Sequence, residues 1–271
     1  MWDVGSIEAA RKIGLARAIS KIGYCSRSQA AELIRAGRVR LNGAVRRDPE
    51  TPVRIEKDRI EVDGRRIEAE AKVYLIMNKP CGLVTTASDE KGRETVYSLL
   101  AEAKLPWVAP VGRLDKASEG LLLLTNDSEW GSRIAAPETH LPKTYHVQIG
   151  SVDGERVARQ LMDGVRDEGE PLRPVHARRL RSGEKNCWLE IVLDEGKNRQ
   201  IRRMLAVLGI EVLRLIRVAI GPLQLGDLSK GKYRALTAEE KLALNRAMQS
   251  AQQMRVIKAR HHPEARHSSA G

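Results

Sequence analysis

The chain has 271 residues, 42% of them hydrophobic and 3% aromatic, and it carries a formal net charge of +12. This length suits one large and one small domain with aliphatic cores, and so strong a positive charge favours a polyanionic partner, nucleic acid first. Three widely spaced cysteines and short apolar runs argue against a zinc site, a disulfide framework and a membrane-spanning helix, so we expect a cytoplasmic protein.

Residues 10–69 are predicted to form a compact unit of two short helices and a small sheet. Apolar residues at helical spacing follow residue 12, and Gly23 is expected to end this first helix. Ser26 is typical of an N-cap and forms a capping box with Gln29, which predicts a second helix that stops near residue 37. The pairs Asn42-Gly43 and Asp63-Gly64 are hairpin-turn sequences, so short strands should flank both.

The same unit carries a dense positive charge. Residues 11–47 hold ten Lys or Arg against one acidic residue, Glu32, which gives the segment a net charge of +9. Folded RNA is recognised mostly through its shape and its phosphates, which arginine suits. The alternative is a solvated helix face without a partner. We predict an RNA-binding surface made of Arg17, Lys21, Arg27, Arg35, Arg38 and Arg40.

A linker at residues 67–72, rich in Glu and Ala, is expected to lead into a larger domain at 72–243. Strands and helices alternate there without a βαβ rhythm, which favours an α+β fold with a mixed, largely antiparallel sheet. The basic residues 244–271 are expected to form a partly disordered tail that adds RNA contacts, although a helix from Ala238 can run on toward Ile257. The predicted strands are 73–77, 121–125, 144–149, 188–193 and 212–218, and the other predicted helices are 157–161 and 199–208.

One carboxylate is placed as a catalytic group would be. Asp115 lies in a short loop just ahead of the strongly apolar segment 121–124, and a loop carboxylate held by a rigid strand suits a nucleophile or a base. Arg113, two residues away, favours the ionised carboxylate. The alternative is a structural pair of Arg and Asp in a surface loop.

Four motifs in order, together with the basic unit, resemble the RsuA-type pseudouridine synthases, which carry an N-terminal S4 RNA-binding domain. Residues 110–115 read P-V-G-R-L-D, which is similar to the family's signature around its catalytic aspartate. Residues 78–86 (N-K-P-C-G-L-V-T-T), 143–145 (K-T-Y) and 195–204 (E-G-K-N-R-Q-I-R-R-M) are similar to its other motifs. The resemblance extends from about residue 11 to about residue 242.

The resemblance implies an isomerisation of uridine to pseudouridine in RNA, without cofactor or metal. Uracil is detached from C1′ of the ribose, turned and rejoined through C5. Asp115 is then the nucleophile, which attacks C1′ or assists by another covalent route. Arg113 displaces the target base from its stack, and Tyr145 stacks on the flipped uracil or moves the C5 proton. Lys197 is expected to pair with Asp115 and keep it ionised.

Further cations of the motifs are expected to contact RNA phosphates: Lys79, Arg199, Arg202 and Arg203. The alternative for the three arginines is a solvated helix face. One departure is visible after the aspartate, where many relatives read D-x-D-T-x-G. This chain has Ala117 and Ser118 there, so the second acid is absent while the hydroxyl is kept.

The favoured substrate is 23S ribosomal RNA, free or within a ribosome-assembly intermediate, and a monomer is the simplest expectation. The same reaction on 16S ribosomal RNA or on tRNA is the nearest alternative. A second alternative is an RNA-binding ribosome-assembly factor without catalysis, which would lack the aspartate. A third is a hydrolase that cleaves a glycosidic bond with two acids, for which Glu119 is the nearest second carboxylate to Asp115.

Overall fold

The computed structural model describes residues 12–87, 89–150 and 152–261, and in 251–261 the backbone alone. The chain divides into two compact units. The small unit comprises the residues up to Val73 together with Ala103–Ala109 and Thr125–Ser128, and the large unit comprises the remainder. In the described residues, no helix combines the length and the apolar character that crossing a membrane requires.

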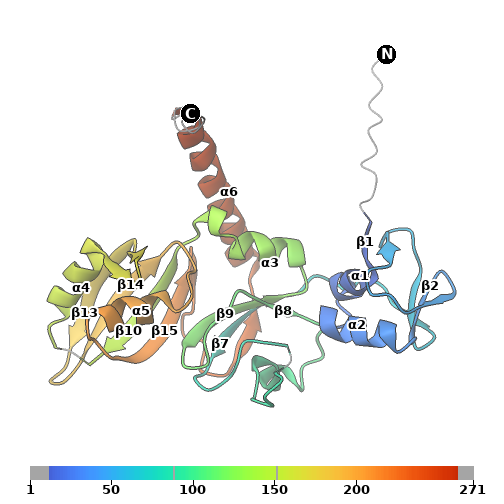
Figure 1. Cartoon of the computed structure of the whole chain (residues 1–271), viewed down its shortest axis with the longest axis horizontal. Helices are drawn as coiled ribbons and strands as arrows, with labels where there is room; N and C mark the ends of the chain where they lie inside the picture. The colour runs from blue at the N-terminus through green and yellow to red at the C-terminus, as the bar shows by residue number, and fades with distance from the viewer. Residues whose placement is uncertain (1–11, 88, 151, 262–271) are drawn as a thin grey trace. The chain divides into compact units, whose positions relative to one another are not determined.

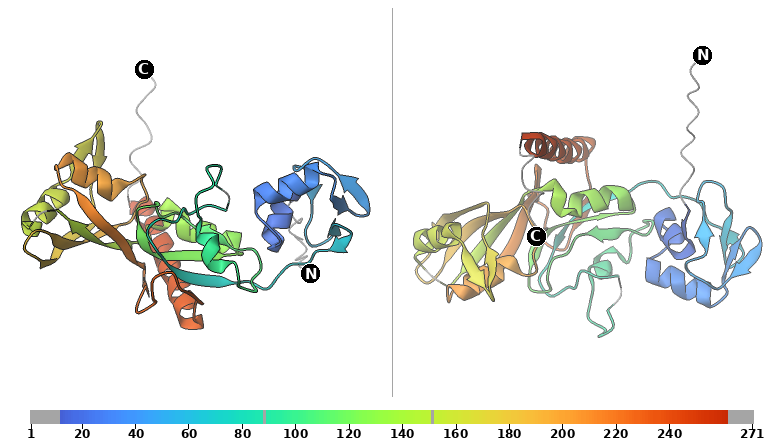
Figure 2. Two further views of the ribbon diagram at one scale, coloured as in Figure 1. Left: turned by 90° about the horizontal axis from the view of Figure 1, so that it is seen from below. Right: turned by 45° about the horizontal axis from the view of Figure 1, so that its top comes forward.

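The small unit packs two helices, α1 (Leu15–Ile22) and α2 (Arg27–Arg35), side by side (Figure 2). Their apolar faces join the sheet residues in one aliphatic core. The sheet has the order β3-β2-β5-β6, and a second pair of strands joins β1 to β4. The strands are β1 (Ile13–Gly14), β2 (Val39–Leu41), β3 (Ala44–Arg46), β4 (Pro52–Val53), β5 (Ile60–Val62) and β6 (Arg65–Arg66).

Local sequence explains the turns of this unit, as predicted. Gly23 ends α1 at φ +92°, a left-handed conformation that glycine adopts without strain. The hydroxyl of Ser26 accepts a hydrogen bond from the Gln29 backbone, while the Gln29 amide oxygen accepts one from the Ser26 backbone, both at 3.1 Å. Asn42 and Gly43 both have positive φ, which the tight turn between β2 and β3 requires.

In the described residues, the large unit is built on a nine-stranded sheet with the order β13-β14-β10-β15-β9-β7-β17, to which β16 and β8 add at β15 and β9. The pair β9–β15 is parallel and its other named pairs, where a register is defined, are antiparallel, which confirms the predicted mixed sheet. Its strands are β7 (Tyr74–Lys79), β8 (Ala109–Val111), β9 (Glu119–Thr125), β10 (Lys143–Ile149), β13 (His176–Ser182), β14 (Cys187–Leu193), β15 (Val212–Ile220), β16 (Leu223–Gln224) and β17 (Tyr233–Ala235).

Two hydrophobic cores flank the middle of this sheet. Helices α4 (Gly154–Asp163) and α5 (Gln200–Val207) contribute to one core with β10, β13, β14 and β15 (Figure 1). Helices α3 (Ser128–Ala135) and α6 (Ala238–His261) contribute to the other with β7 and β9. The remaining elements are the hairpin of β11 (Val165–Asp167) and β12 (Glu170–Leu172) and the 3-10 helices η1 (Val96–Leu100) and η2 (Pro137–Thr139).

The first part of the C-terminal segment continues the helix that the sequence predicts from Ala238. Helix α6 runs without a break to His261, and Leu244 and Met248 are buried in the core that α3 shares. The side chain of Trp130 in α3 donates a hydrogen bond to Asn245 at 2.9 Å. The first part of the predicted tail is therefore a helix that packs on the large unit. Residues 262–271, and residues 10 and 11 at the start of the predicted small domain, lie outside the described residues.

Candidate active site

A cavity of about 620 Å³ in the large unit is lined by all four predicted catalytic residues. Arg113 and Asp115 come from the loop between β8 and β9, Tyr145 comes from β10, and Lys197 comes from the loop that leads into α5. The sheet thus brings together groups that are more than 80 positions apart in sequence. This convergence is the main geometric feature of the site.

Lys79 fixes the loop that carries Asp115. Its side chain is fully buried, and its ammonium donates hydrogen bonds to the carbonyl oxygens of Pro80, Asp115 and Ser118 at 3.1, 3.1 and 2.8 Å. Burial lowers the pKa of Lys79 to about 8. The prediction that Lys79 contacts RNA is therefore wrong, because an ammonium enclosed by three carbonyls of its own protein cannot reach a phosphate. It positions the Asp115 loop instead.

The strand after the loop needs glycine at one position. Gly120 has φ +101°, and a Cβ atom there would clash with the backbone of Arg217 on the parallel strand β15. Every residue of β9 is buried. The Thr85 hydroxyl also donates a hydrogen bond to the Leu114 carbonyl at 2.8 Å. The Asp115 loop is thus held from both of its ends by close packing and buried hydrogen bonds.

The buried side chain of Arg217 lies beside Tyr145 in the sheet. Arg217 is its antiparallel partner on β15, so both side chains lie on the same face of the sheet. The Arg217 Nε donates a hydrogen bond to the Leu121 carbonyl at 2.8 Å. Its Nη2 and the Oε1 of Gln200 are buried and have no hydrogen-bond partner within the described part of the chain, and both side chains line the cavity. The cavity wall therefore contains a donor and an acceptor with unused capacity.

The cation nearest to Asp115 is not the predicted one. The ammonium of Lys197 lies 3.3 Å from Glu195 and 3.5 Å from Glu170, so the expected pairing with Asp115 is wrong in this structure. The side chain of Arg199 lies closer to the aspartate, with 3.9 Å between Nη1 and Oδ2. Arg199 is the N-cap residue of α5 at φ +47°, a left-handed conformation that turns the chain into the helix at the cavity.

The other two arginines of the last motif have partners within the protein. Arg202 is half-buried and donates a hydrogen bond to the Ala117 carbonyl at 2.9 Å, and burial lowers its pKa. Arg203 bonds to Asp167 and Glu170 on the β11–β12 hairpin. The structure therefore gives Arg202 and Arg203 roles in holding α5, and Arg199 is the arginine of this group that lines the cavity.

The predicted RNA-binding residues of the small unit lie at its surface. Arg17, Arg35 and Arg40 are exposed and Lys21 is half-buried. Two more exposed arginines are paired with acids: Arg27 with Glu50 at 2.9 Å and Arg38 with Asp63 through two hydrogen bonds. Exposed pairs of this kind are weak and open to exchange for a phosphate. Whether these side chains bind RNA stays a prediction.

Glu119, the second carboxylate that the hydrolase alternative needs, is already paired with two cations. The side chain of Glu119 is buried and pairs with Lys230 at 2.6 Å and with Arg214 at 3.1 Å. Burial opposes the charged form, but the hydrogen bonds from Arg214 and Lys230 prevail and lower the pKa of Glu119. A carboxyl group held ionised by two cations cannot serve as the general acid that glycosidic hydrolysis needs.

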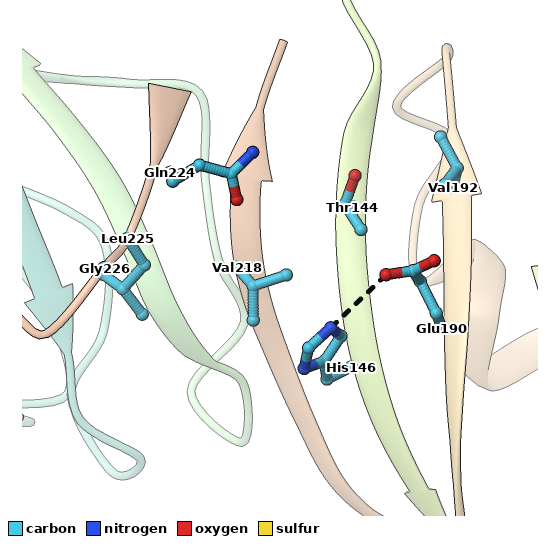
Figure 3. A pocket seen from close by; sticks show the side chains of 8 residues that line it. All are labelled: Thr144, His146, Glu190, Val192, Val218, Gln224, Leu225 and Gly226. Carbon is cyan, nitrogen blue, oxygen red and sulfur yellow. Dashed lines mark ion pairs between the residues drawn. The ribbon is translucent and has the colours of Figure 1, made fainter. Parts of the chain in front are cut away.

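A second pocket, of about 390 Å³, lies on the opposite face of the same strands (Figure 3). Thr144 and His146 line it, and they alternate along β10 with Lys143 and Tyr145 of the first cavity. Figure 3 shows His146 and Glu190 pointing toward one another, at 3.6 Å. The hydrogen bond from Arg178 lowers the pKa of Glu190, so this carboxylate is held ionised between Arg178 and His146.

No group of three His, Cys, Asp or Glu side chains within the described residues could hold a metal ion.

Two family models match the chain. The model described as RNA pseudouridylate synthase matches residues 73–207, which include the Asp115 loop, Tyr145 and the segment with Lys197 and Arg199. The model described as S4 domain matches residues 13–60 in the small unit.

Similar proteins cover nearly the same length. An uncharacterized RNA pseudouridine synthase of Aquifex aeolicus is 40% identical over 232 residues, which span 85% of this chain and 92% of the relative. The ribosomal large subunit pseudouridine synthase B of Bacillus subtilis is 36% identical over 229 residues, 83% of this chain and 93% of the relative. A crystal structure of a pseudouridylate synthase matches with a TM-score of 0.60 at 31% identity, over 86% of this chain and 99% of the other.

Proposed function

Because the chain belongs to the RNA pseudouridylate synthase family and isomerises uridine in RNA, we propose that its substrate is a uridine of 23S ribosomal RNA. The relative from Bacillus subtilis that is named for the large ribosomal subunit supports this choice, since it matches over 93% of its length. The substrate implies a cytoplasmic enzyme. The four predicted catalytic residues line one cavity of a single chain, which supports a monomer with an RNA-binding domain at 10–69 and a catalytic domain at 72–243.

In the proposed mechanism, a carboxylate oxygen of Asp115 attacks C1′ of the ribose. A C–O bond forms, the bond between N1 and C1′ breaks, and the electron pair leaves with uracil as an anion. The uracil turns until C5 faces C1′. The bond from C5 to C1′ then forms as the carboxylate leaves, C5 loses its proton to a base, and N1 gains one. The observation that carries this assignment is the position of Asp115 in one cavity with Tyr145 and Arg199.

The other residues follow from their positions. Arg113 is exposed on the Asp115 loop, where it can take the place of the extruded base in the RNA helix. Tyr145 faces the same cavity, so its ring can stack on uracil and its hydroxyl can relay the C5 proton to a base, passing on its own proton as it accepts the one from C5. Arg199 favours the charge of the free carboxylate at 3.9 Å. Lys79 holds the Asp115 loop in place through its hydrogen bonds to the carbonyls of Asp115 and Ser118.

The test is a map of pseudouridines in total ribosomal RNA and tRNA from cells with and without this protein, read by carbodiimide-stop sequencing. A single site lost from 23S RNA is the expected result. A site lost from 16S RNA or tRNA would replace the substrate and keep the reaction. If no site were lost and the purified protein left transcribed ribosomal RNA unchanged, the proposed function would be wrong.

Asp115→Asn provides the matching test of the nucleophile. The amide keeps the shape of the side chain but is a far weaker nucleophile, so we expect no detectable isomerisation. RNA affinity should stay within a factor of about two, because the exposed cations of the small unit are untouched. An Asp115→Asn variant that still forms pseudouridine in purified form would remove Asp115 from the mechanism.

A further inference from the structure

The small unit contains a groove of about 580 Å³ that the catalytic mechanism does not use. One wall is the face of α2 that presents Gln29, Glu32 and Leu33, at helical spacing. Tyr24, just after α1, forms the near end. Trp107 completes the groove from the segment Ala103–Ala109, which returns to the small unit and is tied to it by a 2.8 Å hydrogen bond from the Trp107 backbone to the Gly23 carbonyl.

The aromatic content of this groove is out of proportion to the rest of the unit. The whole chain has four Trp, five Tyr and no Phe. Within the described part of the small unit, Tyr24 and Trp107 are the only aromatic residues, and both line the groove. Aromatic side chains that line a surface groove are the groups on which unpaired nucleobases stack.

The two rings lie outside the hydrophobic core cluster of the small unit. The core of the small unit is aliphatic and includes neither Tyr24 nor Trp107. Tyr24 is 45% exposed, so a large part of its ring faces solvent. An exposed aromatic ring beside a groove is typical of a binding site.

The polar surroundings favour a nucleotide as the occupant. The Gln29 amide oxygen is used by the capping box, which leaves the amide hydrogens of that side chain available for the edge of a base. Glu32 can accept a hydrogen bond from an exocyclic amine. Arg38, which follows α2, lines the groove, and Arg27 and Arg35 lie exposed on α2 itself. These three side chains offer positive charge to the flanking phosphates.

We propose that this groove binds one unpaired nucleobase of the RNA substrate, stacked on Tyr24 and Trp107. The inference deepens the proposed function and rests on the small unit's role in holding RNA. It separates two tasks within that unit: exposed arginines attract the backbone of any RNA, and the groove selects RNA that offers a splayed base next to a helix.

The experiment compares the full-length protein with Tyr24→Ala, Tyr24→Phe and Trp107→Phe. Val45→Ala is the matched control, since Val45 is a similarly exposed apolar residue of the same unit, at 46%, on β3. The probes are an unstructured RNA of about 12 nucleotides and a blunt duplex of equal charge. Dissociation constants are measured at several salt concentrations, and tryptophan emission is recorded during each titration.

We expect Tyr24→Ala to weaken single-strand binding about 10-fold, as the loss of one base–aromatic stack does. Duplex binding and the slope of log Kd against log salt should not change, because stacking releases no counterions. Tyr24→Phe and Val45→Ala should bind like the wild type. Single-stranded RNA should quench emission in the wild type and much less in Trp107→Phe.

Two results would refute the proposed nucleobase site. One is a Tyr24→Ala variant with unchanged single-strand affinity. The other is a loss shared equally by the duplex or accompanied by a lower salt slope, which would assign Tyr24 to the phosphate-binding surface. Failure of the proposed function looks different. A wild type that shows the stacking signals but forms no pseudouridine at any RNA site would refute the activity and leave the groove intact.

Discussion

Lys79→Met tests the buried ammonium beneath the catalytic loop. Methionine keeps the length of the side chain and removes the nitrogen that donates to the carbonyls of Pro80, Asp115 and Ser118. Two free energies oppose one another. Burial lowers the pKa of Lys79 from 10.5 to about 8, so keeping the group charged at neutral pH costs roughly 3 kcal/mol, which methionine relieves. Three carbonyls without a donor cost roughly 2 kcal/mol each. The expected net loss of stability is about 3 kcal/mol.

The same group predicts how activity depends on pH. A protonated amine donates three hydrogen bonds and a neutral amine two, so one loop carbonyl loses its donor as pH rises through about 8. Turnover should fall there. Stability should move the other way: between about 8 and 10.5 the unfolded chain binds a proton that the folded protein has lost, so the contribution of Lys79 to stability rises with pH.

The assay measures turnover at saturating RNA, RNA affinity and the midpoint of urea unfolding, each from pH 6 to 10. Lys79→Met should lower turnover at least about 100-fold, keep RNA affinity and its salt dependence, and lack the fall near pH 8. Lys185→Met, an exposed lysine in the β13–β14 turn, is the control. The reasoning is refuted if Lys79→Met instead keeps its turnover and binds RNA with a salt slope lower by about one, as the loss of a phosphate contact would produce.

Three further substitutions address other parts of the site. Arg199→Met should lower turnover more than about 10-fold while Lys197→Met has a smaller effect, since Arg199 lies nearer to Asp115; equal effects in steady-state kinetics would contradict this. Gly120→Ala should destabilise the protein by about 2–5 kcal/mol in urea, because a Cβ there meets the β15 backbone. Gly196→Ala, with open space around it, should change stability little, and similar losses would count against the contact. Leu244→Ala should cost about 2–4 kcal/mol, whereas a loose tail would cost nothing.

Sequence predicted the features that depend on short stretches of chain. The capping box of Ser26 and Gln29, the left-handed Gly23 and the Asn42-Gly43 turn appear as expected, because a few neighbouring backbone groups decide each of them. Five predicted strands match β7, β9, β10, β14 and β15, the longer apolar strands of the sheet, whereas the short strands β8, β16 and β17 have no predicted counterpart. The edge strand β13 was missed because it is mostly charged and exposed, and α3 was missed because its apolar face consists of little more than Trp130 and Ile134.

The sequence predicts which loop carries the catalytic carboxylate, but not which groups pair with the charged side chains around it. The motifs pointed to Asp115 and Tyr145, which the fold places in one cavity. The burial of Lys79 could not be predicted, because two of the three carbonyls around its ammonium come from a loop more than 30 positions away. Lys197 pairs instead with its sequence neighbour Glu195 and with Glu170, which reaches it from the β11–β12 hairpin. The sequence feature that could have pointed to Arg199 as the cation near Asp115 is its position immediately before a helix.

The return of residues Ala103–Ala109 to the small unit sets an order of events during synthesis of the chain. The ribosome releases α1, α2 and β5 first, so the aliphatic core can close once Val62 has left the exit tunnel. Trp107 emerges 45 residues later and completes the aromatic groove only then. A nascent chain halted between these two points would carry the basic surface without the groove. If the basic surface and the groove bind RNA as proposed, synthesis from the N-terminus separates the two contacts in time, and truncation between Val62 and Trp107 would leave a protein with the basic surface alone.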